Sequence, residues 1–298
     1  MDNVLTLIAG HGVEGLDSSL VFEVRGALRA LGAEVGNAHW LSPERACDLT
    51  FSGLDAIKAD AIASRILEGW AVDVVAQPLE GRRKRLLVAD MDSTMVTGET
   101  LDELADFAGI KDRIAAITAR AMNGEIGFEA ALRERVGLLK GLSEDCLGKT
   151  WDRIEFTPGA HALVRTMKAH GATAVLVSGG FKFFTSKVRE TCGFDKDIAN
   201  ELIVADGMLT GKVGDTIIGR EAKLATLNAF SAELGISPHL AVAVGDGAND
   251  LDMLRAAGLG VAFHAKPVVA AEARVRIDHG DLTALIYAQG YGDDEMVN

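Results

Sequence analysis

The chain has 298 residues, 48% of them hydrophobic and 24% charged, which allows two ordinary domains and excludes a largely disordered protein. Its formal net charge of −13 argues against a general nucleic-acid-binding protein, because phosphate backbones favour a surplus of Lys and Arg. The 3 cysteines are widely spaced and form no CxxC pair, so neither a disulfide framework nor a zinc site is indicated. Without a basic leader or a run of about 20 apolar residues, we expect a cytoplasmic protein with no membrane partner.

Residues 1–80 predict a small N-terminal module of mixed strands and helices. The strands are expected at 4–9, 34–41, 46–52 and 72–79, and the helices at about 17–32 and 54–68. This βαββαβ order is typical of a ferredoxin-like sandwich, and it resembles the ACT-type modules that sense amino acids. The module has no cluster of catalytic side chains. Effector binding, formation of a homodimer and simple stabilisation of the fold all stay open as its role.

A basic run at residues 82–85 predicts a solvated linker. A second domain, over residues 81–298, has a different pattern of apolar residues. Short uninterrupted apolar runs, as expected of strands buried on both faces, occur at 86–89, 172–177, 240–244 and 259–263. Helical segments separate them, and this alternation predicts an α/β fold with a doubly wound parallel sheet.

Two further segments of this second domain carry structural predictions. Residues 98–157 have the pattern of helices throughout, and an insert directly after the first strand is well placed to form a helical cap over a site. Residues 205–208 predict a hairpin turn, and the tail from Tyr291 is expected to be frayed.

Polar residues follow three of the predicted buried strands, and such strand ends gather at one edge of a parallel sheet. The first end carries Asp90 and Asp92 in the sequence DMDST. One carboxylate can attack phosphorus directly because it is already ionised, and the other can move the protons that the reaction requires. The alternative is that these aspartates only cap the helix that follows.

The second and third strand ends suit a phosphate and a metal ion. Ser178 and Gly179 lie in an SGG sequence, where a hydroxyl and free N–H groups can approach phosphate, or where glycines simply make a turn. In GDGAND, Asp246 together with Asp90 would bind Mg²⁺, while Asn249 and Asp250 would orient its ligands or water. The rivals are a structural turn and a calcium loop, although the spacing is wrong for an EF-hand.

Lys223 and Arg220 lie between the second and third strand ends and compete for one role. Two aspartates, a phosphate and Mg²⁺ leave excess negative charge, so a phosphoryl-transfer site needs a cation directed at the transferred oxygens. Either residue could supply this cation, and a solvated surface charge is the plain alternative for both.

The ordered set Asp-x-Asp-x-Thr, Ser-Gly-Gly, Lys and Gly-Asp-Gly-x-Asn-Asp resembles the haloacid-dehalogenase superfamily, and most closely its phosphoserine phosphatases. The resemblance covers about residues 84–290 and includes VTGETL at 96–101, FEAALRERV at 128–136 and VSGGF at 177–181. It implies a Mg²⁺-dependent hydrolase that converts O-phospho-L-serine to serine and phosphate, the last step of serine biosynthesis.

The resemblance also implies a role for each matching residue. Asp90 would be the nucleophile and Asp92 the general acid/base, with Mg²⁺ bound by Asp90, the main-chain carbonyl of Asp92, and Asp246. Phosphate would contact Ser178, Gly179 and Lys223, with Asn249 beside it. Glu99 would bind the substrate ammonium and Arg135 its carboxylate, while Met122 and Phe128 shield the site.

Two alternatives to this activity stay open. One is a related hydrolase or phosphotransferase that acts on another small phosphate. The other is a regulatory amino-acid-binding protein in which phosphatase activity is secondary. The complete set of aspartates, Ser178 and Lys223 argues against an inactive site.

Overall fold

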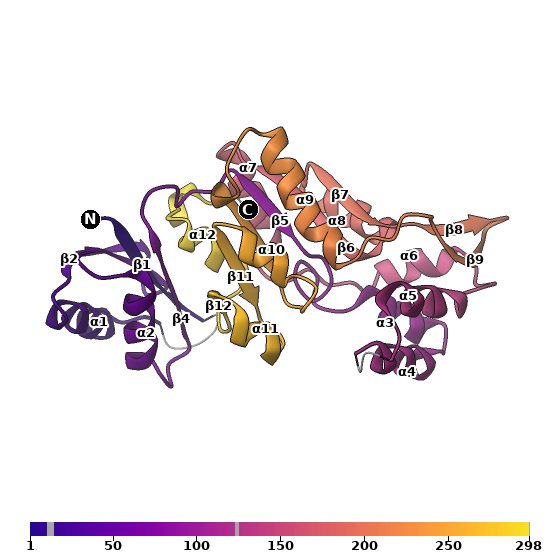
Figure 1. Ribbon diagram of the computed structural model, residues 1–298, viewed down its shortest axis with the longest axis horizontal. Coiled ribbons are helices and arrows are strands. Elements are labelled where there is room, and N and C mark those ends of the chain that lie inside the picture. Colours follow the sequence, from indigo (N-terminus) through magenta and orange to yellow (C-terminus); the bar gives the residue numbers. More distant parts are fainter. Residues whose placement is uncertain (11–14, 123–124, 298) are drawn as a thin grey trace.

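The computed structural model describes residues 1–10, 15–122 and 125–297, apart from the side chain of Met122. Three parts follow one another along its longest axis (Figure 1). A small sheet with two helices lies at one end, a larger sheet flanked by helices lies in the middle, and a group of short helices lies at the other end. We propose that the first part ends near residue 80, between the last strand of the small sheet and the first of the large one.

The N-terminal part is a four-stranded antiparallel sheet in the order β2-β3-β1-β4. Its strands are β1 (Asn3–Ala9), β2 (Glu34–Ser42), β3 (Ala46–Ser52) and β4 (Val72–Pro78). Helices α1 (Ser18–Ala30) and α2 (Ala56–Ile66) begin at Asp17 and Asp55, whose carboxylates accept hydrogen bonds from free N–H groups of the first turn. Apolar residues of both helices and the sheet form one core, as the predicted βαββαβ order requires.

The central part is a six-stranded sheet in the order β12-β11-β10-β5-β6-β7, with every neighbouring pair parallel. Its strands are β5 (Leu86–Ala89), β6 (Thr173–Phe181), β7 (Lys196–Asn200), β10 (Ala241–Gly245), β11 (Leu259–Phe263) and β12 (Val275–Ile277). The four buried strands agree with the prediction. The edge strands β7 and β12 were not predicted, because one is largely polar and the other is only 3 residues long.

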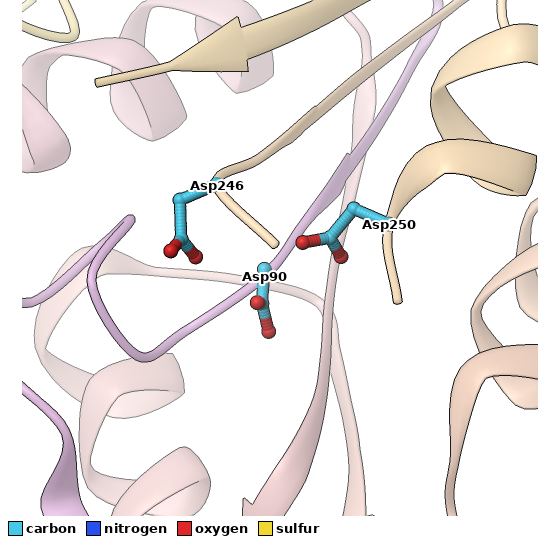
Figure 2. Close-up of side chains that lie close together, drawn as sticks. All are labelled: Asp90, Asp246 and Asp250. Atoms are coloured by element: carbon cyan, nitrogen blue, oxygen red, sulfur yellow. The ribbon is translucent and has the colours of Figure 1, made fainter. Parts of the chain in front are cut away.

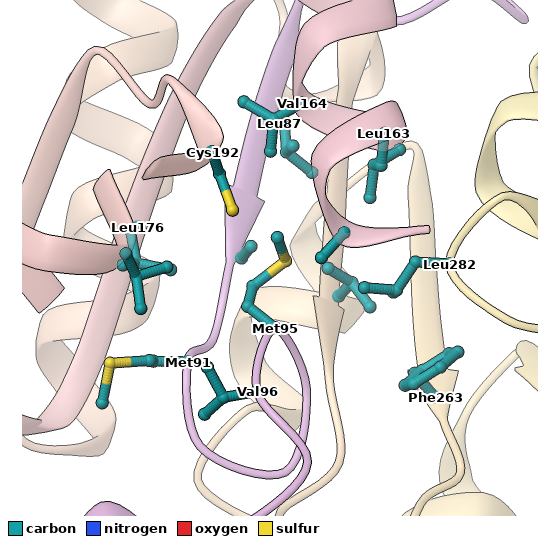
Figure 3. Close-up of a cluster of buried hydrophobic side chains, with 14 of the residues drawn as sticks. Leu87, Met91, Met95, Val96, Leu163, Val164, Leu176, Cys192, Phe263 and Leu282 are labelled. Atoms are coloured by element: carbon teal, nitrogen blue, oxygen red, sulfur yellow. The ribbon is translucent and has the colours of Figure 1, made fainter. Parts of the chain in front are cut away.

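Helices cover both faces of this sheet, so alternate residues of the four buried strands β5, β6, β10 and β11 enter different cores. Leu87 and Leu176 pack with α7 (Ala160–Ala169), α8 (Lys182–Cys192) and α12 (Ala284–Ala288) (Figure 3). Leu86 and Val175 pack with α9 (Arg220–Glu233), α10 (Leu251–Ala256) and α11 (Pro267–Glu272). Short 3₁₀ turns lie at Pro238–Leu240 and Asp293–Glu295. Within the described part of the chain, no helix combines the length and the apolar character needed to span a bilayer.

Four helices between β5 and β6 form the cap: α3 (Thr100–Phe107), α4 (Lys111–Met122), α5 (Phe128–Gly137) and α6 (Asp145–Trp151). The hairpin of β8 (Leu202–Ala205) and β9 (Met208–Val213) reaches this cap from the central part (Figure 1). The Gly141 N–H donates to the Leu209 carbonyl, and the Glu144 N–H to that of Gly207. The predicted turn is present, with φ of 52° at Asp206 and 72° at Gly207, as a tight hairpin requires.

Two predictions about surface segments are wrong. The basic run at residues 82–85 is not a solvated linker throughout, because Arg82 and Lys84 are only 8% and 7% exposed. Nor is the described part of the tail frayed. Tyr291 is 2% exposed, and the Val297 N–H donates to Thr166 Oγ. Both segments carry polar sequences, and their burial comes from tertiary contacts: Arg82 packs between the two parts against Asp48, and the tail packs on α7 of the central part.

Candidate active site

The three predicted strand ends meet at one edge of the central sheet. Asp90 follows β5, Asp246 follows β10, and Ser178 lies near the end of β6; these strands are neighbours in the order β10-β5-β6. One cleft of about 160 Å³ opens there between the sheet and the cap. The predicted site residues that line it are Asp90, Asp92, Glu99, Phe128, Arg135, Ser178, Gly179, Asp246 and Asn249.

Carboxylate oxygens of Asp90, Asp246 and Asp250 lie within 4.8 Å of one another (Figure 2), and Asp90 and Asp246 also line the cleft. All three residues are at most 5% exposed. Asp250 is also engaged elsewhere, because it accepts hydrogen bonds from the Gly247 N–H and from Lys223 Nζ. The donor set therefore fits a hard divalent cation, for which oxygen atoms are the preferred ligands.

Lys223 is the buried cation of the site. Its Nζ lies 2.8 Å from Asp90 Oδ1 and 2.5 Å from Asp250 Oδ1, and the side chain is 1% exposed. Burial alone would lower the pKa of Lys223, but the two carboxylates outweigh it and raise that pKa. Arg220, the competing candidate, lies on the exposed side of α9 and pairs with Asp252. The structure thus separates two residues that charge alone could not distinguish.

Asp92 contacts other groups than Asp90 does: its carboxylate meets Thr100 and Ser178, whereas that of Asp90 meets Lys223. Asp92 Oδ1 accepts the Thr100 N–H at 2.8 Å, and its Oδ2 lies 3.4 Å from Ser178 Oγ. Burial, followed by the negative charge of Glu99, raises the pKa of Asp92 to about 7, although the bond from Thr100 opposes this shift. A carboxyl that titrates near neutral pH can both donate and accept a proton, whereas Asp90 is ion-paired with Lys223.

The Ser178–Gly180 segment forms the opposite wall of the cleft. The Gly180 N–H donates to Ser178 Oγ at 2.9 Å. Asn200, which the sequence analysis missed, holds this segment: its amide donates to the carbonyls of Gly179 and Ile218, and its side-chain oxygen accepts the Ile218 N–H. Asn200 comes from the unpredicted strand β7, so no motif identified it.

The cap reaches the cleft through Phe128, Arg135 and the segment around Glu99. A Cβ atom on Gly179 would lie 3.3 Å from the Phe128 ring, so glycine permits the ring to cover this wall. The Arg135 Nε donates to the Ala131 carbonyl, and Glu99 accepts a hydrogen bond from Ser93 Oγ. Desolvation lowers the pKa of Arg135 and raises that of Glu99. Met122 ends α4, but its predicted role lies outside the described residues.

Lys266 is a second lining residue that the sequence analysis did not select. It follows β11, and its Nζ lies 3.3 Å from Asp246 Oδ2. Lys266 and Arg135 are the cationic side chains that line the cleft, against the acidic side chains of Asp90, Asp92, Glu99 and Asp246. The site thus combines acidic side chains, two basic side chains, and a carboxyl, that of Asp92, whose pKa burial raises to about 7.

Comparison with known proteins agrees with this geometry. A family model described as haloacid dehalogenase-like hydrolase matches residues 87–255. The chain belongs to this family. That span includes β5, β6 and β10, whose ends carry the carboxylates and the serine of the cleft.

Curated relatives of this hydrolase include two phosphoserine phosphatases. The one from Archaeoglobus fulgidus is 46% identical over 217 residues, which are 72% of this chain and 63% of the relative. The one from Polaromonas is 44% identical over 230 residues, or 75% of this chain and 97% of the relative. The hydrolase thus spans less than two thirds of the archaeal protein.

A solved structure extends the similarity to the N-terminal part. The crystal structure of a probable phosphoserine phosphatase from Vibrio cholerae, in an unliganded form, is 29% identical with a TM-score of 0.79. The alignment covers 99% of this hydrolase and 88% of the Vibrio chain. Both sheets therefore have counterparts in one known protein.

Proposed function

We propose that this hydrolase converts O-phospho-L-serine to serine and phosphate through an aspartyl-phosphate on Asp90. Its relatives from Archaeoglobus and Polaromonas are phosphoserine phosphatases, which supports the same activity here. By that activity the enzyme would catalyse the last step of serine biosynthesis. Its occurrence in the cytoplasm and a homodimer formed through residues 1–80 stay predictions.

One observation carries the substrate assignment: Glu99 and Arg135 line the same small cleft as Asp90 and Asp92. Phosphoserine carries an ammonium and a carboxylate beside its phosphate. A guanidinium can bind a carboxylate with two parallel hydrogen bonds, and a carboxylate can pair with an ammonium. A cleft of about 160 Å³ suits so small a zwitterion, and the two charged anchors would fix its orientation.

The protons and bonds of the reaction can be assigned to two aspartates. The Asp90 carboxylate attacks phosphorus while the bond from phosphorus to the serine oxygen breaks, and the Asp92 carboxyl gives its proton to that oxygen. Asp92 then accepts a proton from water as the water oxygen attacks the aspartyl-phosphate, which releases phosphate and restores Asp90. The pKa of Asp92, raised to about 7 by burial, suits both steps.

We propose that the metal ion of this site is Mg²⁺, held by Asp90, Asp246 and the main-chain carbonyl of Asp92. Oxygen donors from Asp90 and Asp246 lie close enough to share one ion. When bound, Mg²⁺ would offset the negative charge of the phosphate and of the carboxylate that attacks it. Lys223 would interact with the transferred oxygens from the buried side, while Ser178 and Gly179 would bind phosphate beside Asn249.

The test of this function is a pair of substitutions that separate amino-acid recognition from phosphate recognition. Arg135→Ala should lower kcat/KM for phosphoserine by tens- to about a thousand-fold, as expected for loss of a charge-assisted bidentate contact. It should have little effect on phosphoethanolamine, which lacks the carboxylate. Glu99→Gln should impair substrates that carry an amine and spare phosphoglycolate, which lacks one.

Arg133→Ala is the matched control, because Arg133 lies on the same helix but is exposed and pairs with Glu129. This variant should match the wild-type protein on every substrate. An equal loss on all substrates for Arg135→Ala would instead favour a hydrolase that acts on another small phosphate. Absence of turnover together with tight binding of serine would favour a regulatory amino-acid-binding protein.

A further inference from the structure

Lys266 contacts Asp246, one of the proposed metal ligands, through both its side chain and its main chain. Its side-chain Nζ lies 3.3 Å from Asp246 Oδ2, and its main-chain N–H donates to the Asp246 carbonyl at 3.2 Å. The side chain is 54% exposed and lines the cleft, so it stays available to an incoming anion. Two cationic side chains line the cleft, and Arg135 is already proposed to bind the substrate carboxylate. Lys266 is therefore the lining cation that stays available for the phosphate dianion.

The backbone that presents Lys266 is held in an uncommon conformation. His264, two residues earlier, has a φ of 42°, a left-handed value that costs free energy for a residue other than glycine. Two hydrogen bonds hold it: the His264 N–H donates to the Ile277 carbonyl, and Nε2 lies 2.8 Å from the Gly280 carbonyl oxygen. Both partners belong to the segment at the end of β12.

The N-terminal domain holds that segment from the other side. Asp73, on β4, is 4% exposed, and its carboxylate accepts the main-chain N–H groups of Asp278, His279 and Gly280. These bonds satisfy the acceptor oxygens of a buried carboxylate and fix the backbone that contacts His264. A continuous chain of hydrogen bonds thus runs from the N-terminal sheet to the backbone that carries Lys266. Strands β4 and β12 lie side by side at this junction (Figure 1).

We propose that Lys266 is a further substrate-binding residue, which attracts the phosphate dianion into the cleft, and that Asp73 is a positioning residue which holds it there. The N-terminal domain then acts on the active site by fixing one loop. This inference rests on the proposed function only in requiring a phosphorylated substrate. An exposed rim cation affects mainly the association of a charged ligand and its salt dependence, so its loss should alter KM more than kcat.

Steady-state kinetics on phosphoserine with Mg²⁺, at low and high ionic strength, test the role of Lys266. Lys266→Met should raise KM roughly threefold to tenfold at low salt, keep kcat within about twofold, and flatten the salt dependence of kcat/KM. Lys266→Arg keeps the charge and should restore both KM and the salt dependence. An unchanged KM and salt dependence in Lys266→Met would overturn the proposal.

A double-mutant cycle tests the role of Asp73. Asp73→Ala should raise KM about twofold to fivefold, and this effect should vanish in a Lys266→Met background, because residues that act through one another are not additive. Gln77→Met is the control: it removes another interdomain hydrogen bond, from Gln77 to the Ala288 carbonyl, and should leave KM unchanged. If Asp73→Ala folds poorly, His264→Gly removes the side-chain bond to the Gly280 carbonyl inside the catalytic domain and should raise KM in the same direction.

Calorimetric binding of inorganic phosphate, with Mg²⁺ present, keeps the two proposals apart. Lys266→Met and Asp73→Ala should both weaken phosphate binding, whereas Gln77→Met should not. If the wild-type protein did not hydrolyse phosphoserine, the proposed function would be overturned. Weaker phosphate binding by Lys266→Met and Asp73→Ala than by that wild-type protein would still support this inference. A KM effect of Asp73→Ala that persists in the Lys266→Met background would overturn the route through Lys266.

Discussion

Arg82, between the two domains, and Lys223, beneath the cleft, are both buried cations, but their surroundings neutralise them differently. Arg82 donates to both oxygens of Asp48, at 2.6 and 2.7 Å, and also to Thr6 Oγ and to the main-chain carbonyls of Tyr287 and Ala288. One guanidinium thus meets one carboxylate and several neutral acceptors. Lys223 instead meets two carboxylates, those of Asp90 and Asp250, with Asp246 close by.

This difference shows what distinguishes a structural charge from a reactive one in the same protein. At Arg82 the charges balance and the donors have partners, so nothing there needs a ligand. Around Lys223 the carboxylates outnumber the cation, and the excess negative charge favours binding of a metal ion. Substitutions at the two places should therefore affect different properties, stability at Arg82 and turnover at the active site.

The largest expected effect is on turnover, from Asp90→Asn. The amide keeps the size of the side chain but removes the attacking charge, so kcat should fall by about 10⁴-fold or more, as for the loss of other nucleophiles. The melting temperature should change little, because Lys223 keeps Asp250 as a partner. Acid-quenched wild-type protein should retain labelled phosphate and the variant should not; an active variant would exclude Asp90 as the nucleophile.

Arg82→Met should affect stability instead. It leaves Asp48, which is 4% exposed, without its charged partner, and removing one member of a buried pair costs about 3–5 kcal/mol of unfolding free energy. Denaturant unfolding measures this loss. The neighbouring variant Arg83→Met is the control, because Arg83 forms an exposed pair with Glu295. If Arg82→Met were as stable as Arg83→Met, the contrast between the two buried cations would fail.

Lys223→Met tests the other side of the comparison. Loss of the cation that faces the transferred oxygens should lower kcat by about 10²–10³-fold, the range seen when one electrostatic contact to a transition state is removed. Its cost in stability should be smaller than that of Arg82→Met, since burial already raises the pKa of Asp250 and a proton can replace the lost charge. Both kcat and the free energy of unfolding should be measured for each variant. A larger loss of unfolding free energy in Lys223→Met than in Arg82→Met would contradict the comparison.

The smallest effect concerns Asp60 on α2, a half-buried carboxyl. Burial raises its pKa to about 6, while Arg274 and a hydrogen bond from Ala76 only partly oppose this. The folded protein thus favours the protonated form, so its stabilising contribution is present near pH 4 and lost as pH rises through about 6. Asp60→Asn should gain stability over wild type between pH 5 and 8, by less than about 2 kcal/mol. A stability difference that is independent of pH would argue against this shift.

Strands and turns that depend only on residues close together in the sequence were predicted correctly. The apolar runs of β5, β10 and β11 and the turn at Asp206 and Gly207 follow from strand burial and backbone geometry, which short stretches of sequence encode. Edge strands and segments covered by another domain were not. β7 is largely polar, and Arg82 resembles a solvated residue until Asp48, 34 positions away, is placed beside it.

The sequence by itself determined which polar side chains gather at the site, because residues that follow neighbouring parallel strands meet at one edge of the sheet. It placed Asp90, Asp92, Ser178 and Asp246 at one sheet edge, and the structure has them there. Charge alone left Lys223 and Arg220 as equal candidates, and the tertiary structure agrees with the choice of Lys223 that the resemblance implied. Only the tertiary structure brought Lys266 and Asn200 into contact with the site and joined Asp73 to the loop beyond β12. Those contacts depend on distances between residues far apart in the chain, for which the local pattern contains no signal.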